Sequence, residues 1–204
     1  MYIDILYSSI IYGHTSCYNY LRPKQNIYPM FNGCSPLYMA AKYDQPQMME
    51  LLRQNDAFFD QNQSIKDYTP LIIACESGAV NATHYLCNLE DTDVNLRDYS
   101  GETALIKACV SNSIGCVKEL LAHKSLLIDI VKSNDRAAIW RASFRGYYDI
   151  VKLLLEHSEK LKKENEDLYE EYSVIDINRP DSDNYTPVFV AAQNDHLDVV
   201  KLLM

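Results

Sequence analysis

A seven-residue pattern recurs five times in this chain, and the first four copies are spaced by 34 residues. The copies begin at Ser35, Thr69, Thr103, Ala137 and Thr186, and each is a mostly apolar run that ends in a pair of small residues. The fifth copy follows the fourth by 49 residues, so 15 residues are inserted between them. Self-similarity at this period indicates a stack of supersecondary units, because no single unit can bury its apolar face alone. Stacks of this kind more often provide binding surfaces than active sites.

Each copy begins with the signals of a short helix. The hydroxyl of Thr69 can accept a hydrogen bond from the first turn, and Pro70 suits the next position because no amide hydrogen is needed there. The small residue Ala74 allows a neighbouring helix to approach closely, and Gly78 can adopt the left-handed conformation that ends a helix. A second apolar stripe at helical spacing follows, and Asp-Val-Asn at 93–95 then leads through polar residues to the next copy. The predicted unit is therefore helix, turn, helix and extended loop.

The repeated unit resembles the ankyrin repeat, whose family pattern runs roughly G-x-T-P-L-H-x-A-A, then G-H and an aliphatic helix, then D-V-N. Residues 186–204 match this pattern best, with Thr-Pro at the start, a pair of alanines and an aliphatic second helix. The resemblance extends back to residues 6–13, which makes six helix pairs with a degenerate first pair. It implies an all-α ankyrin-repeat solenoid of stacked helix-turn-helix units with extended loop tips. The units of this single array, 1–204, are expected at 3–31, 32–65, 66–99, 100–133, 134–182 and 183–204, the last being truncated.

Two departures from the family pattern bear on stability. The histidine of the pattern is absent from every copy, and an apolar or aromatic residue replaces it, so we expect apolar contacts in place of inter-repeat hydrogen bonds. The replacing residues are Tyr38, Ile72, Ile106, Trp140 and Phe189. The fourth copy also has Ala137 and Ala138 where the others have a capping residue and, in most, a proline. Because such a cap typically contributes about 1 kcal/mol, we predict that this unit is the weakest.

Composition and charge limit the classes of partner. The chain has 204 residues, of which 48% are hydrophobic and 23% charged, which is typical of a folded protein. Its net charge is −9, whereas proteins that bind the phosphate backbone of nucleic acids are typically basic, so we expect no nucleic-acid ligand. The apolar N-terminal segment has no basic start and no long uninterrupted apolar core, so we expect neither secretion nor direct membrane insertion.

The six cysteines favour a structural role. They include no C-x-x-C pair, and Cys75 and Cys109 occupy equivalent positions in neighbouring units, where the family pattern has alanine. Free cysteine behaves as a small buried hydrophobe, so we interpret these residues as core residues rather than as metal ligands or disulfides. A reducing compartment follows, and we expect a cytoplasmic location with the nucleus as an alternative.

The sequence contains no catalytic motif of the common kinds. There is no glycine-rich phosphate loop, no G-x-S-x-G and no H-E-x-x-H. We therefore predict a non-enzymatic chain with no cofactor, no metal and no small-molecule substrate, which binds a protein partner of unknown identity. Two alternatives are a targeting or substrate-recognition arm of a larger enzyme, such as a kinase or a ubiquitin-ligase adaptor, and a tether for a cytoskeletal or membrane protein. The apolar stripe of the last unit also predicts that the chain belongs to a longer array.

The insertion after the fourth copy is rich in charged residues and has no Gly or Pro, so a helix can continue through about 157–173. Leu154, Leu161 and Leu168 recur every seven residues, as in a coiled coil, but the pattern is shorter than the three to four heptads that such a signal needs. Two interpretations stay open, a solvated charged helix and a helix that docks onto a partner.

The resemblance also implies where a partner would bind. In ankyrin arrays the loop tips and the exposed side of the first helices form a concave surface. Tyr and Arg are common among the matching positions here, and both are enriched where binding energy concentrates, although a chain with sixteen tyrosines presents some on any face. The candidate partner-binding residues are Tyr68, Tyr99, Glu102, Arg136 and Tyr185 at the tips, with Tyr43, Glu76, Phe144 and Arg145 on the helices.

Overall fold

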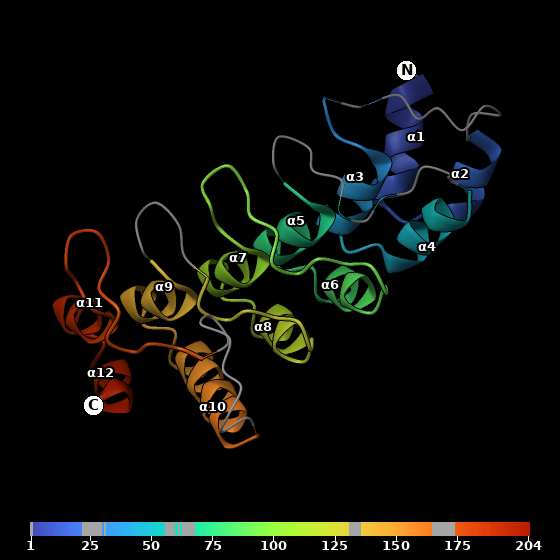
Figure 1. Cartoon of the computed structure of the whole chain (residues 1–204). Helices are drawn as coiled ribbons and strands as arrows, with labels where there is room; N and C mark the ends of the chain where they lie inside the picture. The colour runs from blue at the N-terminus through green and yellow to red at the C-terminus, as the bar shows by residue number, and fades with distance from the viewer. Residues whose placement is uncertain are drawn as a thin grey trace.

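The computed structural model describes residues 2–21, 30, 32–55, 60, 62, 68–130, 136–164 and 174–204. These residues form twelve α-helices in six consecutive pairs and contain no β-strand (Figure 1), which confirms the predicted all-α solenoid. In chain order the pairs are α1 (Tyr2–Ile11) with α2 (Thr15–Leu21), α3 (Pro36–Lys42) with α4 (Pro46–Asn55), α5 (Pro70–Glu76) with α6 (Val80–Cys87), α7 (Ala104–Val110) with α8 (Ile114–Leu121), α9 (Ala138–Arg145) with α10 (Tyr148–Glu164), and α11 (Pro187–Gln193) with α12 (Leu197–Leu203).

The helices lie in two rows (Figure 1). The first helices of the pairs, α3, α5, α7, α9 and α11, pack side by side, and the second helices lie along one side of them. The loops that lead into α7 and α11 project from the row of first helices on the opposite side. We call the surface bordered by these loops and the first helices the inner face, because the candidate residues of the loop tips and first helices belong to it.

The first helices begin as the sequence predicts. The hydroxyls of Ser35, Thr69, Thr103 and Thr186 each accept a hydrogen bond from the backbone amide three residues later, at 3.1 to 3.4 Å. Ala137 has the same extended backbone, with φ −63° and ψ 169°, but no hydroxyl to offer. The α9 helix of the fifth unit therefore begins without the side-chain cap of its neighbours, and the relative weakness of this unit stays a prediction.

The turn after each first helix confirms the register of the repeats. The equivalent positions in five units all have a positive φ between 54° and 70°. Only two of them are glycine, and the other three are Asp or Asn, the side chains that tolerate the left-handed region best. These residues are Asp44, Gly78, Asn112, Gly146 and Asp195.

The core runs between successive pairs. Leu71, Leu105 and Ile139 occupy the same position in three units and are each 1 to 2% exposed. Cys75 and Cys109 are buried beside them, as expected for small core residues, and burial raises the pKa of both thiols.

The core assignment is wrong for part of the cysteine set. Cys17 is exposed, whereas Cys34 and Cys87 are partly buried and pack against the core, and Cys116 on α8 is fully buried. All six side chains are free thiols.

The row that replaces the family histidine is buried only in the middle of the array. Ile72, Ile106 and Trp140 are 1 to 4% exposed, which confirms the expected apolar contacts there. Phe189, however, is 47% exposed, because α11 packs against α9 on one side and no described first helix covers its other side. The expectation of burial is therefore wrong for Phe189.

The helix α10 is 17 residues long, whereas the other second helices have seven to ten. It includes the start of the expected 157–173 insertion, while residues 165–173, with Leu168, lie outside the described residues. Leu154 is fully buried in the stack and Leu161 is partly buried. The amide of Ile175 donates to the hydroxyl of buried Ser158 at 3.0 Å, so the chain returns close to where it left the stack. The coiled-coil interpretation stays a prediction.

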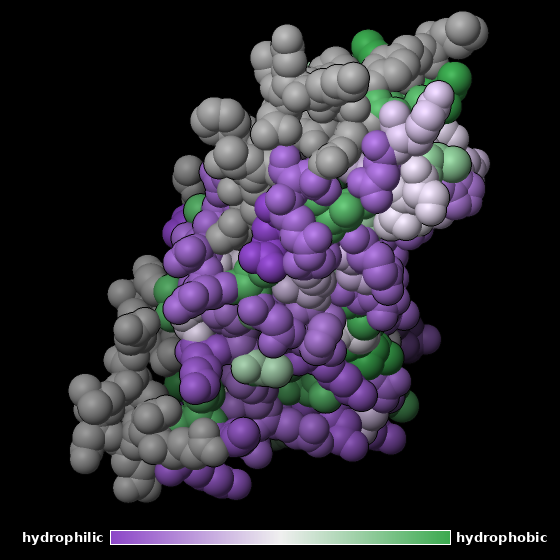
Figure 2. All heavy atoms as spheres, turned by 90° about the vertical axis from the view of Figure 1, so that its right-hand side faces the viewer, coloured by the Kyte–Doolittle hydropathy of each residue, from purple (hydrophilic) through white to green (hydrophobic). Residues whose placement is uncertain are grey.

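Exposed apolar residues occur near both ends of the chain. Ile5 and Tyr12 are 49% and 67% exposed on the N-terminal side, and Leu197 and Met204 are 60% and 94% exposed on the C-terminal side. Figure 2 shows the side of the molecule on which α1, α2 and α4 lie, where hydrophobic residues form separate areas within a mostly hydrophilic surface. Among the described helices, none combines the length and the apolar character that crossing a bilayer requires.

Candidate functional site

Two columns of stacked side chains lie on the inner face of the last two units. In the first column, Trp140 and Phe144 are four residues apart on one side of α9, and Arg136 precedes the helix in the loop before its N-terminal residue. The guanidinium carbon of Arg136 lies 4.6 Å from the centroid of the Trp140 ring. The rings of Trp140 and Phe144 are stacked, with centroids 5.4 Å apart and planes inclined by 7°. The column therefore combines cation–π and aromatic contacts.

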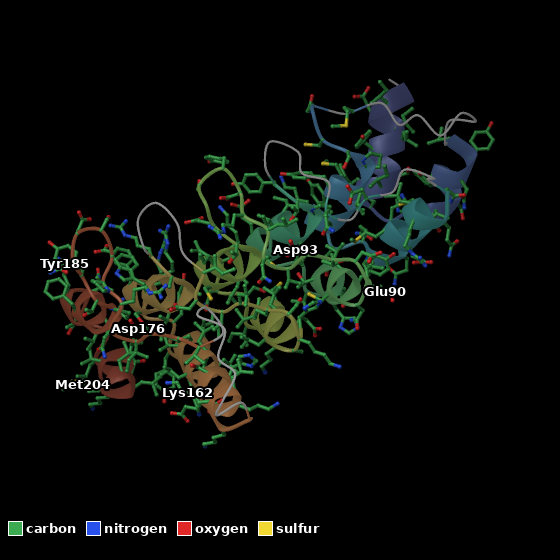
Figure 3. The ribbon with its side chains drawn as sticks, viewed as in Figure 1. Glu90, Asp93, Lys162, Asp176, Tyr185 and Met204 are labelled. Atoms are coloured by element: carbon green, nitrogen blue, oxygen red, sulfur yellow. The ribbon has the colours of Figure 1, made fainter. Side chains whose placement is uncertain are left out.

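The second column belongs to the following unit. Tyr185 and Phe189 are also four residues apart, and their rings stack with centroids 4.7 Å apart and an angle of 6°. The indole Nε1 of Trp140 donates a hydrogen bond to the backbone oxygen of Tyr185 at 3.0 Å, which fixes the two columns relative to each other. Figure 3 shows Tyr185 on the loop side of the array, away from Lys162 and Met204 on the side of the second helices.

A pocket of about 220 Å³ lies beside the two columns. Trp140 is buried, whereas Phe144 and Tyr185 are 40% and 41% exposed, so aromatic surface stays accessible around the pocket. None of the described lining residues is acidic, and three of them are arginine. We call this site the aromatic pocket, and its lining residues are Val110, Arg136, Trp140, Arg141, Phe144, Arg145, Tyr185, Val190 and Gln193.

The three arginines of the aromatic pocket are not equivalent. The Nε atom of Arg136 lies 2.9 Å from the carboxylate of Asp181, which is fully buried. Arg141 forms an ion pair with Glu102 of the preceding unit. Arg145 is exposed at the end of α9, and no carboxylate among the described residues lies within ion-pairing distance of it. One guanidinium is thus available to a ligand.

A second charged cluster lies on the inner face one unit earlier. The Nζ atom of Lys107 lies 2.9 Å from carboxylate oxygens of both Asp98 and Glu102, and 3.5 Å from Glu76. The side chain of Lys107 is only 9% exposed. Burial alone would lower its pKa, but the hydrogen bonds that its ammonium donates to Asp98 and Glu102 outweigh burial and hold the pKa of Lys107 well above its usual value. The cluster is therefore an internal ion-pair network.

Aromatic rings cover this cluster. The Nζ atom of Lys107 lies 5.2 Å from the centroid of the Tyr68 ring, and the Tyr68 and Tyr99 rings are 6.1 Å apart. Tyr99 is 73% exposed, so it extends the accessible aromatic surface of the inner face toward the N-terminal units.

Most of the nine predicted site residues come together in these two places. Four of them, Arg136, Phe144, Arg145 and Tyr185, line the aromatic pocket. Three others, Tyr68, Glu76 and Glu102, contact Lys107, and a fourth, Tyr99, lies against the ring of Tyr68.

Two predicted site residues have a different environment from the rest. Glu102 forms ion pairs with both Lys107 and Arg141 and its side chain is only 17% exposed, so it holds the inner face together. Tyr43 is 43% exposed on the second unit, where its described ring contact is with Lys42, and it joins neither cluster.

The residues of these clusters that sequence reasoning missed as candidate binding residues include Lys107, Trp140, Arg141 and Phe189. Trp140 and Phe189 were assigned to packing between units. Lys107 and Arg141 share one repeat position, four residues after the cap, where the other copies have the apolar residues Met39, Ile73 and Val190. A cation at an otherwise apolar repeat position is the signal that could have identified them. In the part of the chain that the structure describes, no group of three or more His, Cys, Asp or Glu residues is placed to hold a metal ion.

Family models match most of the chain. The model described as ankyrin repeats (3 copies) matches residues 57–131, 89–167 and 124–204, and the single ankyrin repeat model matches residues 32–63.

Several characterised proteins are similar in sequence. The chain is 33% identical over 105 residues to the ankyrin repeat protein nuc-2 of Neurospora crassa, covering 52% of the chain and 10% of that protein. It is 26% identical over 185 residues to alpha-latrocrustotoxin-Lt1a of Latrodectus tredecimguttatus, covering 84% of the chain and 12% of the toxin. It is 25% identical over 177 residues to the human transient receptor potential cation channel subfamily A member 1, covering 84% of the chain and 14% of the channel subunit. The chain thus spans only 10 to 14% of the length of these relatives.

A solved structure has a similar fold. The ankyrin repeat domain of Bcl-3, a member of the IkappaB protein family, superposes with a TM-score of 0.76 at 21% identity. The similarity covers 98% of this chain and 84% of that structure.

Proposed function

The chain belongs to the ankyrin repeat family, and on this premise we propose that its inner face binds a segment of a partner protein. Ankyrin repeats are generally protein–protein interaction modules, and the fold is typically a non-enzymatic scaffold. The observation that carries the proposal is the accessible aromatic surface of the inner face, to which Tyr99, Phe144 and Tyr185 contribute. Aromatic side chains offer a large contact area at low conformational cost and are enriched among residues that dominate binding energy.

The mechanism is rigid presentation of this surface. The capped first helices, the buried leucines between units and the hydrogen bond from Trp140 to Tyr185 hold the side chains in place before a partner arrives. A pre-organised surface loses less conformational entropy on association, so more of the contact energy appears as affinity.

The protein context is part of the proposal. The relatives that contain similar arrays are seven to ten times longer than the matched region, which supports a module within a longer protein. Their differing names favour no single larger activity, so a targeting arm of an enzyme and a tether for a cytoskeletal or membrane protein are alternatives that the full-length sequence distinguishes. Free thiols buried at Cys75 and Cys109 support a reducing compartment such as the cytoplasm.

Site-specific photo-crosslinking in cell extract tests the proposal. A benzophenone amino acid replaces Tyr99 or Tyr185 on the inner face, and Lys118 or Lys152 on the second helices serves as the matched exposed control. We expect protein adducts from the first two positions and few from the controls. Adducts obtained only from Lys118 or Lys152 would place the interface on the other side of the array. Arg136 is not a suitable test position, because its loss would leave the buried carboxylate of Asp181 without its ion pair.

A further inference from the structure

We propose that the aromatic pocket binds an extended peptide segment of a protein partner in which an aromatic side chain lies next to a carboxylate. This inference rests on the proposed function and specifies the chemistry that one part of the inner face selects. Three observations support it: the volume of the pocket, the exposed aromatic surface beside it, and the ion pairing of its three arginines.

The aromatic half of the ligand follows from the shape and lining of the pocket. Its volume of about 220 Å³ accommodates one large side chain. Trp140 is buried beneath the inner face, while Phe144 and Tyr185 present accessible ring surface beside the pocket. The indole N–H of Trp140 already donates to the backbone oxygen of Tyr185, so this residue holds no free donor, and the accessible surface comes from the rings of Phe144 and Tyr185. A planar aromatic side chain can stack on this surface and displace water from it.

The acidic half of the ligand follows from charge. Two arginines of the aromatic pocket are neutralised, Arg136 by Asp181 and Asp183 and Arg141 by Glu102. Arg145 has no ion pair with any described residue, so a single unneutralised guanidinium faces the ligand on a chain whose net charge is −9. A guanidinium pairs with a carboxylate through two parallel hydrogen bonds.

The same charges favour a carboxylate over a phosphate. A phosphate group carries nearly two negative charges, and three carboxylates already border the arginines of the pocket. One free guanidinium balances a single carboxylate, whereas a dianion would meet repulsion from Glu102, Asp181 and Asp183. The neighbouring acidic groups disfavour an anionic membrane or a nucleic acid in the same way.

The closeness of the two groups follows from the lining of the pocket. Phe144 and Arg145 both line it, so an aromatic ring against the first and a carboxylate against the second lie close together on the ligand. The lining extends from Val110 of the fourth unit to Gln193 of the last, which suits an extended segment that crosses several units.

Peptide selection provides the test. The whole chain is panned against a library of random twelve-residue peptides, and enriched peptides are then labelled with fluorescein for anisotropy titration. We expect enriched sequences to carry Phe, Tyr or Trp beside Asp or Glu. Arg145→Glu should weaken these peptides at least about tenfold and should shift the library selection to Lys or Arg beside the aromatic residue. Phe144→Ala should weaken binding by a similar factor while the acidic preference persists.

Two controls accompany the variants. Lys118→Glu makes the same change of charge on the exposed side of α8 and should leave the titrations unchanged. Arg145→Gln, with circular dichroism of every variant, separates a lost ion pair from a folding defect. Failure to enrich acidic aromatic peptides, or titrations that do not respond to Arg145→Glu, would overturn the pocket chemistry.

The outcome is distinguishable from that of the proposed function. If acidic aromatic peptides are not selected but photo-adducts still form at Tyr185, the pocket chemistry is wrong and the proposed function stands. If photo-adducts form only on the second helices while the peptides are still selected, the pocket chemistry stands and the assignment of the inner face as the partner surface is wrong.

Discussion

Asp129 occupies in the fourth unit the position that Asn95 occupies in the third, and each side chain bonds to the chain of the following unit. The side chain of Asn95 accepts a hydrogen bond from the amide of Leu127 at 2.9 Å and donates one to the carbonyl oxygen of Ser125 at 2.7 Å. Asp129 accepts from the amide of Asp176 at 3.3 Å, but its buried Oδ1 atom has no hydrogen-bond partner among the described residues. The side-chain amide of Asn95 thus both donates and accepts a hydrogen bond, whereas the carboxylate of Asp129 at the equivalent position has no hydrogen to donate.

Replacing Asp129 by Asn should stabilise the array in a pH-dependent way. Burial raises the pKa of Asp129 to about 6, and the guanidinium of Arg179 offsets this only in part. Compared with the unfolded chain, the folded chain thus favours the protonated form of the Asp129 carboxyl. The stabilisation that this preference gives the folded state is complete below the ordinary pKa of 3.8 and is lost as the pH rises through about 6. We expect Asp129→Asn to raise the free energy of unfolding by about 1 to 2 kcal/mol at pH 8, with a smaller gain at pH 5.

Denaturant unfolding at pH 5 and pH 8 measures this gain. Asp195→Asn makes the same chemical change at an exposed turn residue that tolerates a positive φ, and it should change stability little at either pH. A gain for Asp129→Asn that is equal at the two pH values would contradict the assigned titration.

Ala137→Thr should stabilise the fifth unit by about 1 kcal/mol, because it supplies the missing cap of α9. The backbone at Ala137 already matches that at Thr103, where φ is −84° and ψ is 168°, and the two residues are similarly buried. The melting temperature of the variant measures the gain. Thr103→Ala should lose a similar amount, and a loss of stability in Ala137→Thr would show that the site has no room for the side chain.

Truncation of a core leucine should destabilise the stack by roughly 2 to 5 kcal/mol. Leu71→Ala and Leu105→Ala both remove side chains that are at most 2% exposed between successive units. Leu197→Ala is the matched control, since its side chain is 60% exposed and should cost little. Chemical denaturation of the three variants compares them, and losses below about 0.5 kcal/mol at Leu71 and Leu105 would contradict their place in the core.

Deleting residues 159–173 should leave the fold intact. The amide of Ile175 bonds to the hydroxyl of Ser158, so the two ends that the deletion joins already lie close together. Shortening a surface connection changes the entropy of loop closure only slightly. Circular dichroism and thermal melting of the shortened chain check this expectation. Aggregation, or a marked fall in melting temperature, would indicate that the deleted segment packs against the stack.

The sequence by itself determined the fold, because the signals that build an ankyrin unit are local and are repeated. A capping hydroxyl such as that of Thr69, a small pair at the end of the first helix and a residue that tolerates a positive φ each act within one turn of helix. Their recurrence at one spacing specifies the stacking, since equivalent faces must meet. The same local logic correctly predicted the buried leucines and the uncapped start at Ala137.

Only the tertiary structure decided which exposed positions form a site. Trp140 bonds to the backbone of Tyr185, 45 residues away along the chain, and the aromatic pocket exists because the two units are packed side by side. The charge of that pocket also depends on distant partners: Asp181 neutralises Arg136, while no described carboxylate reaches Arg145. A charged side chain either forms an ion pair within the fold or stays available to a ligand, and distances of a few ångströms between units decide which. The reason is that the attraction between charges weakens with separation and with screening by salt. The repeat pattern of the sequence does not specify these distances between side chains of different units.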